Sequence, residues 1–218
     1  MRVETLAVHA GAEPDALTGA MAPPLHLATT FKHGAAGERI AGYEYQREGN
    51  PTQDRLEAAL SALEGGEAAL AFASGMAAIT ALLESLPNGS RILIPDDCYT
   101  GTRVLAHEFL PERGITATMV DMSDLDAVRA ACTGVGLIWA ETPSNPRLKV
   151  CDLAALAEIA HDADAVLACD NTFATPILQQ PLALGADIVM HSTTKYFGGH
   201  SDVLGGALVF AQRNGFFE

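Results

Sequence analysis

Short apolar runs alternate with segments of helical periodicity over most of the chain, from residue 51 onward. The apolar runs predict strands at residues 67–73, 91–95, 115–121, 137–141, 165–170, 188–191 and 205–210. Between them, leucines and alanines recur at helical spacing, which predicts helices at residues 51–64, 76–86, 100–110, 124–131, 153–163 and 179–185. Strands that are apolar throughout and separated by helices indicate an α/β protein. Its mostly parallel sheet would carry helices on both faces.

Polar residues and glycines mark the ends of several predicted helices. Asn50 is expected to cap the helix that Pro51 opens, and Gly65 with the next glycine is expected to end it. Ser123 and Asp152 are expected to cap the helices that follow them. Residues 1–50 lack sustained periodicity and contain several Gly and Pro, so they are predicted to form an extended arm beside a domain at residues 51–218.

Composition narrows the classes of partner. The 218 residues carry a formal net charge of −14, which argues against nucleic acid and anionic membranes as partners. No stretch has the features of a signal peptide or of a membrane span, and we therefore expect a cytoplasmic protein. The four cysteines form no CxxC pair and are expected to be free thiols.

Polar residues follow the predicted strands, at the sheet edge where parallel α/β proteins bind ligands. The segments in question are Ser74–Met76, Asp96–Tyr99, Glu141–Pro146, Asp170–Thr172 and His191–Lys195. The chain has only three lysines, and Lys195 lies between an apolar run with small hydroxyl residues and an aromatic pair with two glycines. A partly buried amine loses its proton more easily and so becomes a nucleophile, which makes Lys195 a candidate for chemistry.

Pyridoxal phosphate would account for this set of residues. Its aldehyde needs an amine, for which Lys195 is the candidate, and its ring nitrogen needs a carboxylate such as Asp170. Tyr99 could stack on the ring. The phosphate needs backbone N–H groups at a helix start and nearby hydroxyls, which the chain offers in Ser74, Gly75, Met76, Ser192 and Thr194.

Each of these residues also has a plainer interpretation. Asp170 could cap a helix, Tyr99 could belong to the core, Gly75 could form a tight turn, and Lys195 could lie on the surface. Ser192 and Thr194 could form hydrogen bonds with nearby backbone groups. A metal site at residues 191, 200 and 202 is disfavoured because the spacing fits no common ligand pair. The phosphate-loop, dinucleotide and hydrolase-elbow signatures are missing from the sequence.

Seven stretches resemble the Cys/Met metabolism family of pyridoxal-phosphate enzymes, the group of cystathionine γ-synthase and cystathionine γ-lyase. They are ETLAVHAG, EYQREGNPTQDRLE, FASGMAAI, DDCYTGT, ETPSNP, DNTFATP and HSTTKYFGGHSDVLGG, and they extend over nearly the whole chain. Thr100 departs from the glycine that the family commonly has there. The resemblance implies the fold-type I, aminotransferase-like large domain. It also implies a C-terminal small domain that is absent from this chain and that carries the arginine for the substrate carboxylate.

The resemblance assigns roles within the domain. It implies that Lys195 holds the cofactor covalently, that Asp170 binds its ring nitrogen, and that Tyr99 covers its ring, so these three are the expected catalytic residues. The other residues expected to contact the cofactor are Gly75, Met76, Ser192 and Thr194 at the phosphate, Asn145 near the 3′ oxygen and Thr172 beneath the ring. No metal is expected.

The resemblance also gives the arm a role in a neighbouring subunit. Tyr45 and Arg47 are expected to reach the phosphate bound by that subunit, so that the site needs a dimer, and the resemblance implies a homotetramer built as a dimer of dimers. Substrate contacts are expected from Glu44, Tyr45 and Asn145. Glu44 and the GNPT sequence fit the γ-acting branch, so the expected reaction is γ-elimination of cystathionine, a sulfur amino acid. A γ-synthase remains an alternative, as does a catalytically inactive, truncated cofactor-binding module.

Overall fold

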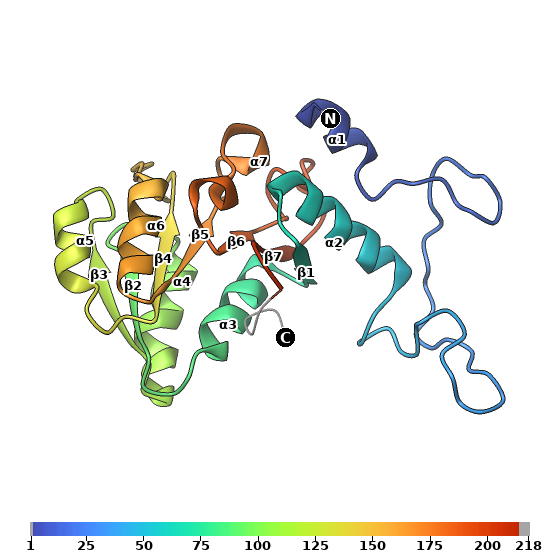
Figure 1. Ribbon diagram of the computed structural model, residues 1–218, viewed down its shortest axis with the longest axis horizontal. Helices are drawn as coiled ribbons and strands as arrows, with labels where there is room; N and C mark the ends of the chain where they lie inside the picture. Colours follow the sequence, from blue (N-terminus) through green and yellow to red (C-terminus); the bar gives the residue numbers. More distant parts are fainter. Residues whose placement is uncertain (1, 214–218) are drawn as a thin grey trace. The chain divides into compact units, whose positions relative to one another are not determined.

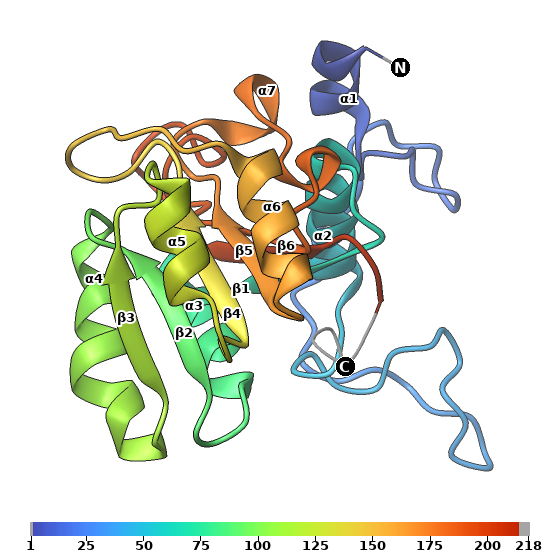
Figure 2. The same ribbon diagram turned by 60° about the vertical axis from the view of Figure 1, so that its left-hand side comes forward.

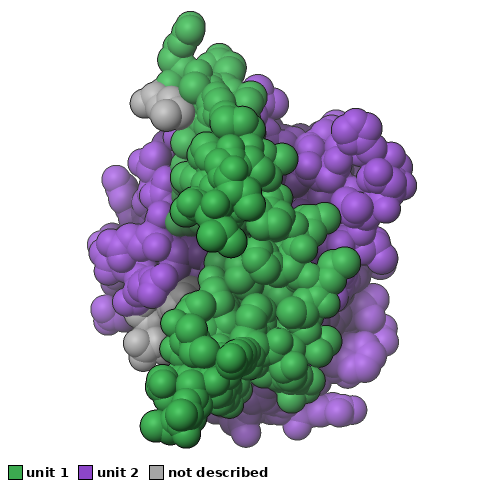
Figure 3. Space-filling model, turned by 90° about the vertical axis from the view of Figure 1, so that its right-hand side faces the viewer, with its two compact units in different colours: residues 1–63 green, residues 64–218 purple. Residues whose placement is uncertain are grey.

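The computed structural model describes residues 2–213, and the chain falls into two compact units, Met1–Leu63 and Glu64–Glu218 (Figure 3). The first unit contains the helices α1 (Val3–His9) and α2 (Pro51–Glu64), the latter except for its last residue, with an irregular segment between them (Figure 1). The Asn50 side chain accepts a hydrogen bond from the Thr52 N–H at 2.8 Å, so the predicted cap of α2 is confirmed. Helix α1 was not predicted, because its seven residues include no buried side chain.

Within the described part of the second unit, seven strands form one sheet, in the order β1-β7-β6-β5-β4-β2-β3. Strands β2 (Arg91–Pro95), β3 (Thr116–Val120), β4 (Leu137–Glu141), β5 (Val166–Asp170) and β6 (Ile188–His191) are parallel. Strand β7 (Gly206–Phe210) runs antiparallel between β6 and β1 (Ala68–Phe72). The mostly parallel α/β sheet that the apolar runs predict is therefore confirmed.

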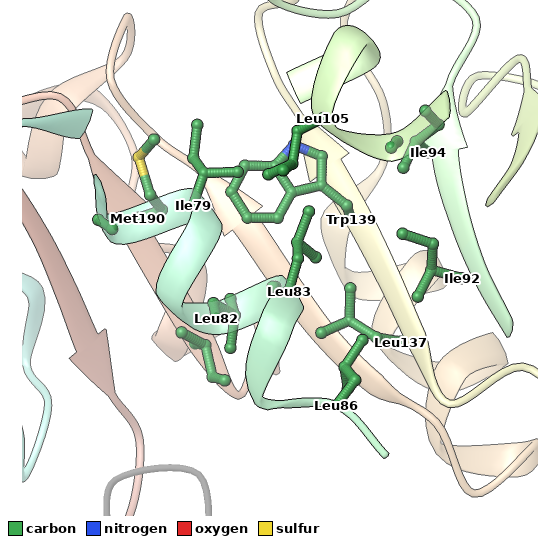
Figure 4. Close-up of a cluster of buried hydrophobic side chains, with 14 of the residues drawn as sticks. Ile79, Leu82, Leu83, Leu86, Ile92, Ile94, Leu105, Leu137, Trp139 and Met190 are labelled. Atoms are coloured by element: carbon green, nitrogen blue, oxygen red, sulfur yellow. The ribbon is translucent and has the colours of Figure 1, made fainter. Parts of the chain in front are cut away.

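Helices cover both faces of this sheet. On one face, α3 (Gly75–Ser85) and the π-helical turn η1 (Leu105–Phe109), which continues the helix α4 (Thr100–Val104), pack on a core that contains Trp139 and Leu83 (Figure 4). The 3-10 turn η2 (Leu110–Arg113) follows η1. On the other face lie α5 (Leu125–Ala131) and α6 (Leu153–Asp162), which are in front of the strands in Figure 2. Successive residues of β4 alternate between the two cores, which fixes the side of the sheet to which each side chain points.

Three local predictions need comment. Asp152 caps α6 as predicted, with its carboxylate accepting from the Ala155 N–H at 3.1 Å. The predicted cap of α5 was wrong: Asp124 caps the helix, and the Ser123 hydroxyl instead donates to Asp121. The short helix α7 (Thr175–Leu178) was missed, and the helix predicted at 179–185 is a single 3-10 turn, η3 (Pro181–Leu184).

Within the described residues, the structure contains no helix with both the length and the apolarity needed to cross a bilayer. All four cysteines are free thiols, as the sequence predicted.

Candidate active site

A cavity of about 240 Å³ opens at the carboxyl ends of the parallel strands. Its walls come from the segments that follow β1, β2, β4, β5 and β6, which are the segments selected from the sequence. Nine predicted cofactor residues line it, namely Gly75, Met76, Tyr99, Asn145, Asp170, Thr172, Ser192, Thr194 and Lys195. The sheet thus brings together residues that lie far apart in the sequence, from Gly75 to Lys195. The roles of these residues stay predictions.

The amino end of α3 forms one end of the cavity. Ser74 caps this helix by accepting a hydrogen bond from the Ala77 N–H at 3.0 Å, and Gly75 is its first residue. A Cβ atom on Gly75 would lie 2.8 Å from the Ser192 Cβ, so only glycine allows the helix and the loop after β6 to approach this closely. Free N–H groups at a helix start, beside the Ser192 hydroxyl, form a suitable site for a phosphate.

Two threonine hydroxyl groups near this end hydrogen-bond to the backbone. Thr172 Oγ1 accepts from the Ser192 N–H at 2.9 Å, which joins the loops after β5 and β6. Thr194 Oγ1 donates to the Gly205 carbonyl and accepts from the Gly205 N–H, both at 3.1 Å. The plainer interpretation of Thr194, as a group that satisfies local backbone, thus describes its bonds in this structure even though the residue lines the cavity.

Asp170 ends strand β5 and is 7% exposed. Burial raises the pKa of this carboxyl, against the lowering effects of the hydrogen bonds from Thr172 and of the electrostatic interactions with His191 and Lys195. Its Oδ1 accepts from the Thr172 N–H at 3.0 Å, and it does not cap a helix. A cationic group placed beside Asp170 would relieve the cost of its burial, as a protonated pyridine ring would.

A second carboxylate, which the sequence did not single out, lies next to Asp170. Glu141 is its register partner on β4 and is also buried at the cavity. Burial, and then the charge of Asp170, raises the pKa of Glu141 to about 8, although two backbone N–H groups act in the opposite direction. One donates from Tyr99 to Oε2 at 2.8 Å and the other from Asn145 to Oε1 at 2.7 Å. The only signal in the sequence was the position of Glu141 at the end of a buried strand.

His191, which a metal site would need, is engaged elsewhere. It is fully buried, and its Nε2 lies 2.5 Å from Oε1 of Glu64. The side-chain amide of Asn171 donates to the same oxygen at 2.9 Å, and the Phe197 ring packs edge-on against the imidazole. Glu64, at the start of the second unit, is therefore hydrogen-bonded to residues at the ends of both β5 and β6.

The predicted arm residues lie in the first unit. Glu44, Tyr45 and Arg47 line a separate hollow, and the Arg47 guanidinium lies 4.6 Å from the centre of the Tyr45 ring. Arg39 binds Glu44 through two hydrogen bonds of 2.9 and 2.7 Å. The described residues that line the cavity of the second unit do not include Glu44, Tyr45 or Arg47.

The donor set of the cavity fits pyridoxal phosphate. It offers one amine in Lys195, one buried carboxylate in Asp170 where a cation is favoured, an aromatic ring in Tyr99, and a helix start closed by Gly75 and Ser192. These are the groups that the aldehyde, the ring nitrogen, the ring face and the phosphate require.

Comparisons with known proteins agree with this assignment. Residues 4–216 match the model of a family described as Cys/Met metabolism PLP-dependent enzyme. The chain is 51% identical over 207 residues to cystathionine gamma-synthase of Mycobacterium tuberculosis, covering 94% of this chain and 53% of that protein. It is 47% identical to cystathionine gamma-lyase of Bacillus subtilis, covering 98% of this chain and 56% of that protein.

Solved structures give the same result for the fold. The crystal structure of metB from Corynebacterium glutamicum matches with a TM-score of 0.95 and 45% identity, over 98% of this chain and 56% of that one. Cystathionine gamma-lyase from Lactobacillus plantarum, complexed with L-serine, matches with a TM-score of 0.93. The predicted fold class is confirmed, and the chain spans about half the length of the relatives it matches.

Proposed function

Because the chain belongs to the Cys/Met metabolism PLP-dependent enzymes, whose cofactor is pyridoxal phosphate, we propose that it forms the cofactor-binding part of an enzyme of cystathionine metabolism. The proposed reaction is γ-elimination, in which cystathionine and water give cysteine, 2-oxobutanoate and ammonia. The observation that carries the proposal is the single cavity in which Lys195, Asp170 and the amino end of α3 meet. The proposal concerns the whole protein, because the chain spans about half the length of the relatives that it matches.

When bound, the cofactor supplies an electron sink that stabilises negative charge on the substrate carbons. The Lys195 amine would hold the aldehyde and, once free, would move protons between the substrate carbons. Asp170 would keep the ring nitrogen protonated, and Tyr99 would cover the ring and assist departure of the leaving group. Met76, Gly75, Ser192 and Thr194 would bind the phosphate, Thr172 would lie beneath the ring, and Asn145 would bind near the 3′ oxygen.

The arm would complete the site of a neighbouring subunit in a dimer of dimers. In this proposal Tyr45 and Arg47 contact the partner's phosphate, and Glu44 with Tyr45 contacts the distal part of the substrate. Support comes from the first unit, where Arg47 makes no ion pair with any described residue and packs on the Tyr45 ring. A guanidinium without a carboxylate partner is free to bind a phosphate oxygen.

A second candidate is γ-replacement, in which cysteine displaces the activating group of an activated homoserine. It is favoured by the 51% identity to a protein named cystathionine gamma-synthase, against 47% for the relative named gamma-lyase. The two reactions share the residues of the cavity, and the choice of γ-elimination as the first candidate rests on Glu44, whose position before Tyr45 resembles that of γ-lyases.

The test has two arms. Borohydride reduction of the pyridoxal-phosphate complex should fix the cofactor on the peptide that contains Lys195, and recovery of the label on Lys32 or Lys149 would overturn the assignment. Release of 2-oxobutanoate from cystathionine, and formation of cystathionine from cysteine and activated homoserine, should then be compared in the full-length protein. The faster reaction identifies the function, and failure of both with cofactor bound would refute the proposal.

A further inference from the structure

Glu141 connects two loops that enter the cavity from different parts of the chain. Its Oε2 accepts the N–H of Tyr99, which lies 42 residues earlier, at 2.8 Å. Its Oε1 accepts the N–H of Asn145, four residues later, at 2.7 Å. Both acceptor atoms of one carboxylate are thus used, each for a residue that the proposed function places against the cofactor ring.

We propose that Glu141 is a positioning residue that fixes Tyr99 and Asn145 relative to each other and to the cofactor ring. The inference rests on the proposed function, because it concerns how the same cavity receives pyridoxal phosphate. Two N–H donors on separate loops require two acceptor atoms, and among the side chains of this length only a carboxylate supplies both. A glutamine would offer one oxygen and would turn its NH2 group toward the other N–H.

Burying the Glu141 carboxylate beside Asp170 costs free energy, which argues against an incidental role for its two hydrogen bonds. Its side chain is 6% exposed and points to the same edge of the sheet as Asp170, its register partner on the adjacent strand. Asp97 and Cys98 face it from the loop after β2, and Lys195 lines the same cavity from the loop after β6. Two neighbouring buried carboxyls repel each other when both are ionised, so the ionised form of Glu141 is stabilised chiefly by the two N–H groups and by any cation that enters.

The loop that carries Asn145 has a second, independent anchor, which supplies a matched control. The Ser144 hydroxyl donates to Asp97 and accepts from the Lys149 N–H at 2.9 Å. Ser144→Ala therefore loosens the same loop without touching the bonds of Glu141. A general loosening of the loop and a specific loss of positioning can then be told apart.

The experiment measures pyridoxal-phosphate affinity of the whole chain, followed by quenching of Trp139, the one tryptophan in the sequence. At about pH 9, where Glu141 is ionised, Glu141→Gln should weaken binding by about tenfold or more, the usual effect of losing a hydrogen bond to a charged group. Ser144→Ala should change affinity less than Glu141→Gln does. In a Tyr99→Ala/Asn145→Ala background the two backbone N–H groups remain but the side chains that they position are gone, so Glu141→Gln should have little further effect.

The pH profile provides a readout that a purely structural role would not move. Glu141 is more ionised at about pH 9 than at about pH 7, so the ratio of variant to wild-type Kd should be larger at the higher pH. A ratio of one at both pH values, or a full effect of Glu141→Gln in the double-alanine background, would overturn the inference. Failure of the wild-type chain to bind the cofactor would instead refute the proposed function.

Discussion

Gly75→Ala tests whether the close approach of α3 to the loop after β6 forms the phosphate site. An ideal Cβ at this position would lie 2.8 Å from Cβ, 3.0 Å from Oγ and 3.1 Å from Cα of Ser192. Ordinary carbon–carbon contacts are about 3.5–4.0 Å, so the two segments must separate by about 0.5 Å or more. Overpacking of this kind typically costs about 1–3 kcal/mol of folding stability.

The same separation should weaken cofactor binding. The phosphate would need donors from both Ser192 and the helix start, and moving one away lengthens those hydrogen bonds. A loss of about 1.4 kcal/mol or more corresponds to at least a tenfold higher Kd for pyridoxal phosphate. Titration of the chain with the cofactor, followed through Trp139 fluorescence, measures this Kd, and thermal unfolding measures the stability.

Two further variants test the reasoning. Gly136→Ala serves as the control, because its Cβ would meet nothing closer than 3.9 Å and should affect neither quantity much. Gly75→Ala combined with Ser192→Gly removes two of the three clashing atoms and should recover part of the lost stability. Wild-type affinity in Gly75→Ala, or no recovery in the double variant, would refute the steric account.

The remaining predictions concern charged groups. Asp170→Asn should retain most cofactor affinity but slow exchange of the substrate α-proton in deuterated water, since a neutral ring is a weaker electron sink; an unchanged exchange rate removes Asp170 from this role. The folded-state pKa of Glu141 is raised from 4.5 to about 8, so its contribution to stability is fully present below its unfolded pKa and is lost as the pH rises through about 8. Denaturant unfolding of the cofactor-free chain should therefore show that the free energy of unfolding falls as the pH rises from about 4.5 to about 8. The fall should be less steep in Glu141→Gln. Arg47→Ala mixed with Lys195→Ala should restore one active site per hybrid dimer of the full-length protein, and inactive hybrids with proven subunit exchange would exclude the cross-subunit arm.

The fold was largely predictable because its strands are uninterrupted apolar runs. Strands β2, β4 and β6 begin and end at the predicted residues. The antiparallel direction of β7 could not be predicted, because an apolar run carries no information about strand direction. Short elements such as α7 also escaped prediction, since four residues cannot establish a helical period.

The candidate site was predictable to the extent that it follows strand ends. Asp170 and Lys195 could be found because Asp170 ends one buried strand and Lys195 comes soon after another. Glu141 was missed because its importance lies in bonds to Tyr99 and Asn145, and these depend on how two loops meet after folding. The preference for Ser123 over Asp124 as a cap was wrong for a similar reason: both residue types cap helices well, and the Asp121 side chain engages Ser123.

The charge balance of the cavity gives a physical reason for an arm that serves another subunit. Among the described lining residues, Lys195 is the only basic side chain, whereas Glu141 and Asp170 are both acidic. A phosphate carrying about 1.5–2 negative charges would meet only neutral donors at the start of α3. A guanidinium supplied from outside this cavity would offset that charge, and Arg47 is a candidate because it has no carboxylate partner among the described residues. If so, Arg47→Ala should weaken binding of pyridoxal phosphate while leaving binding of pyridoxal, which has no phosphate, nearly unchanged. Equal losses for the two compounds would mean that Arg47 acts on something other than the phosphate.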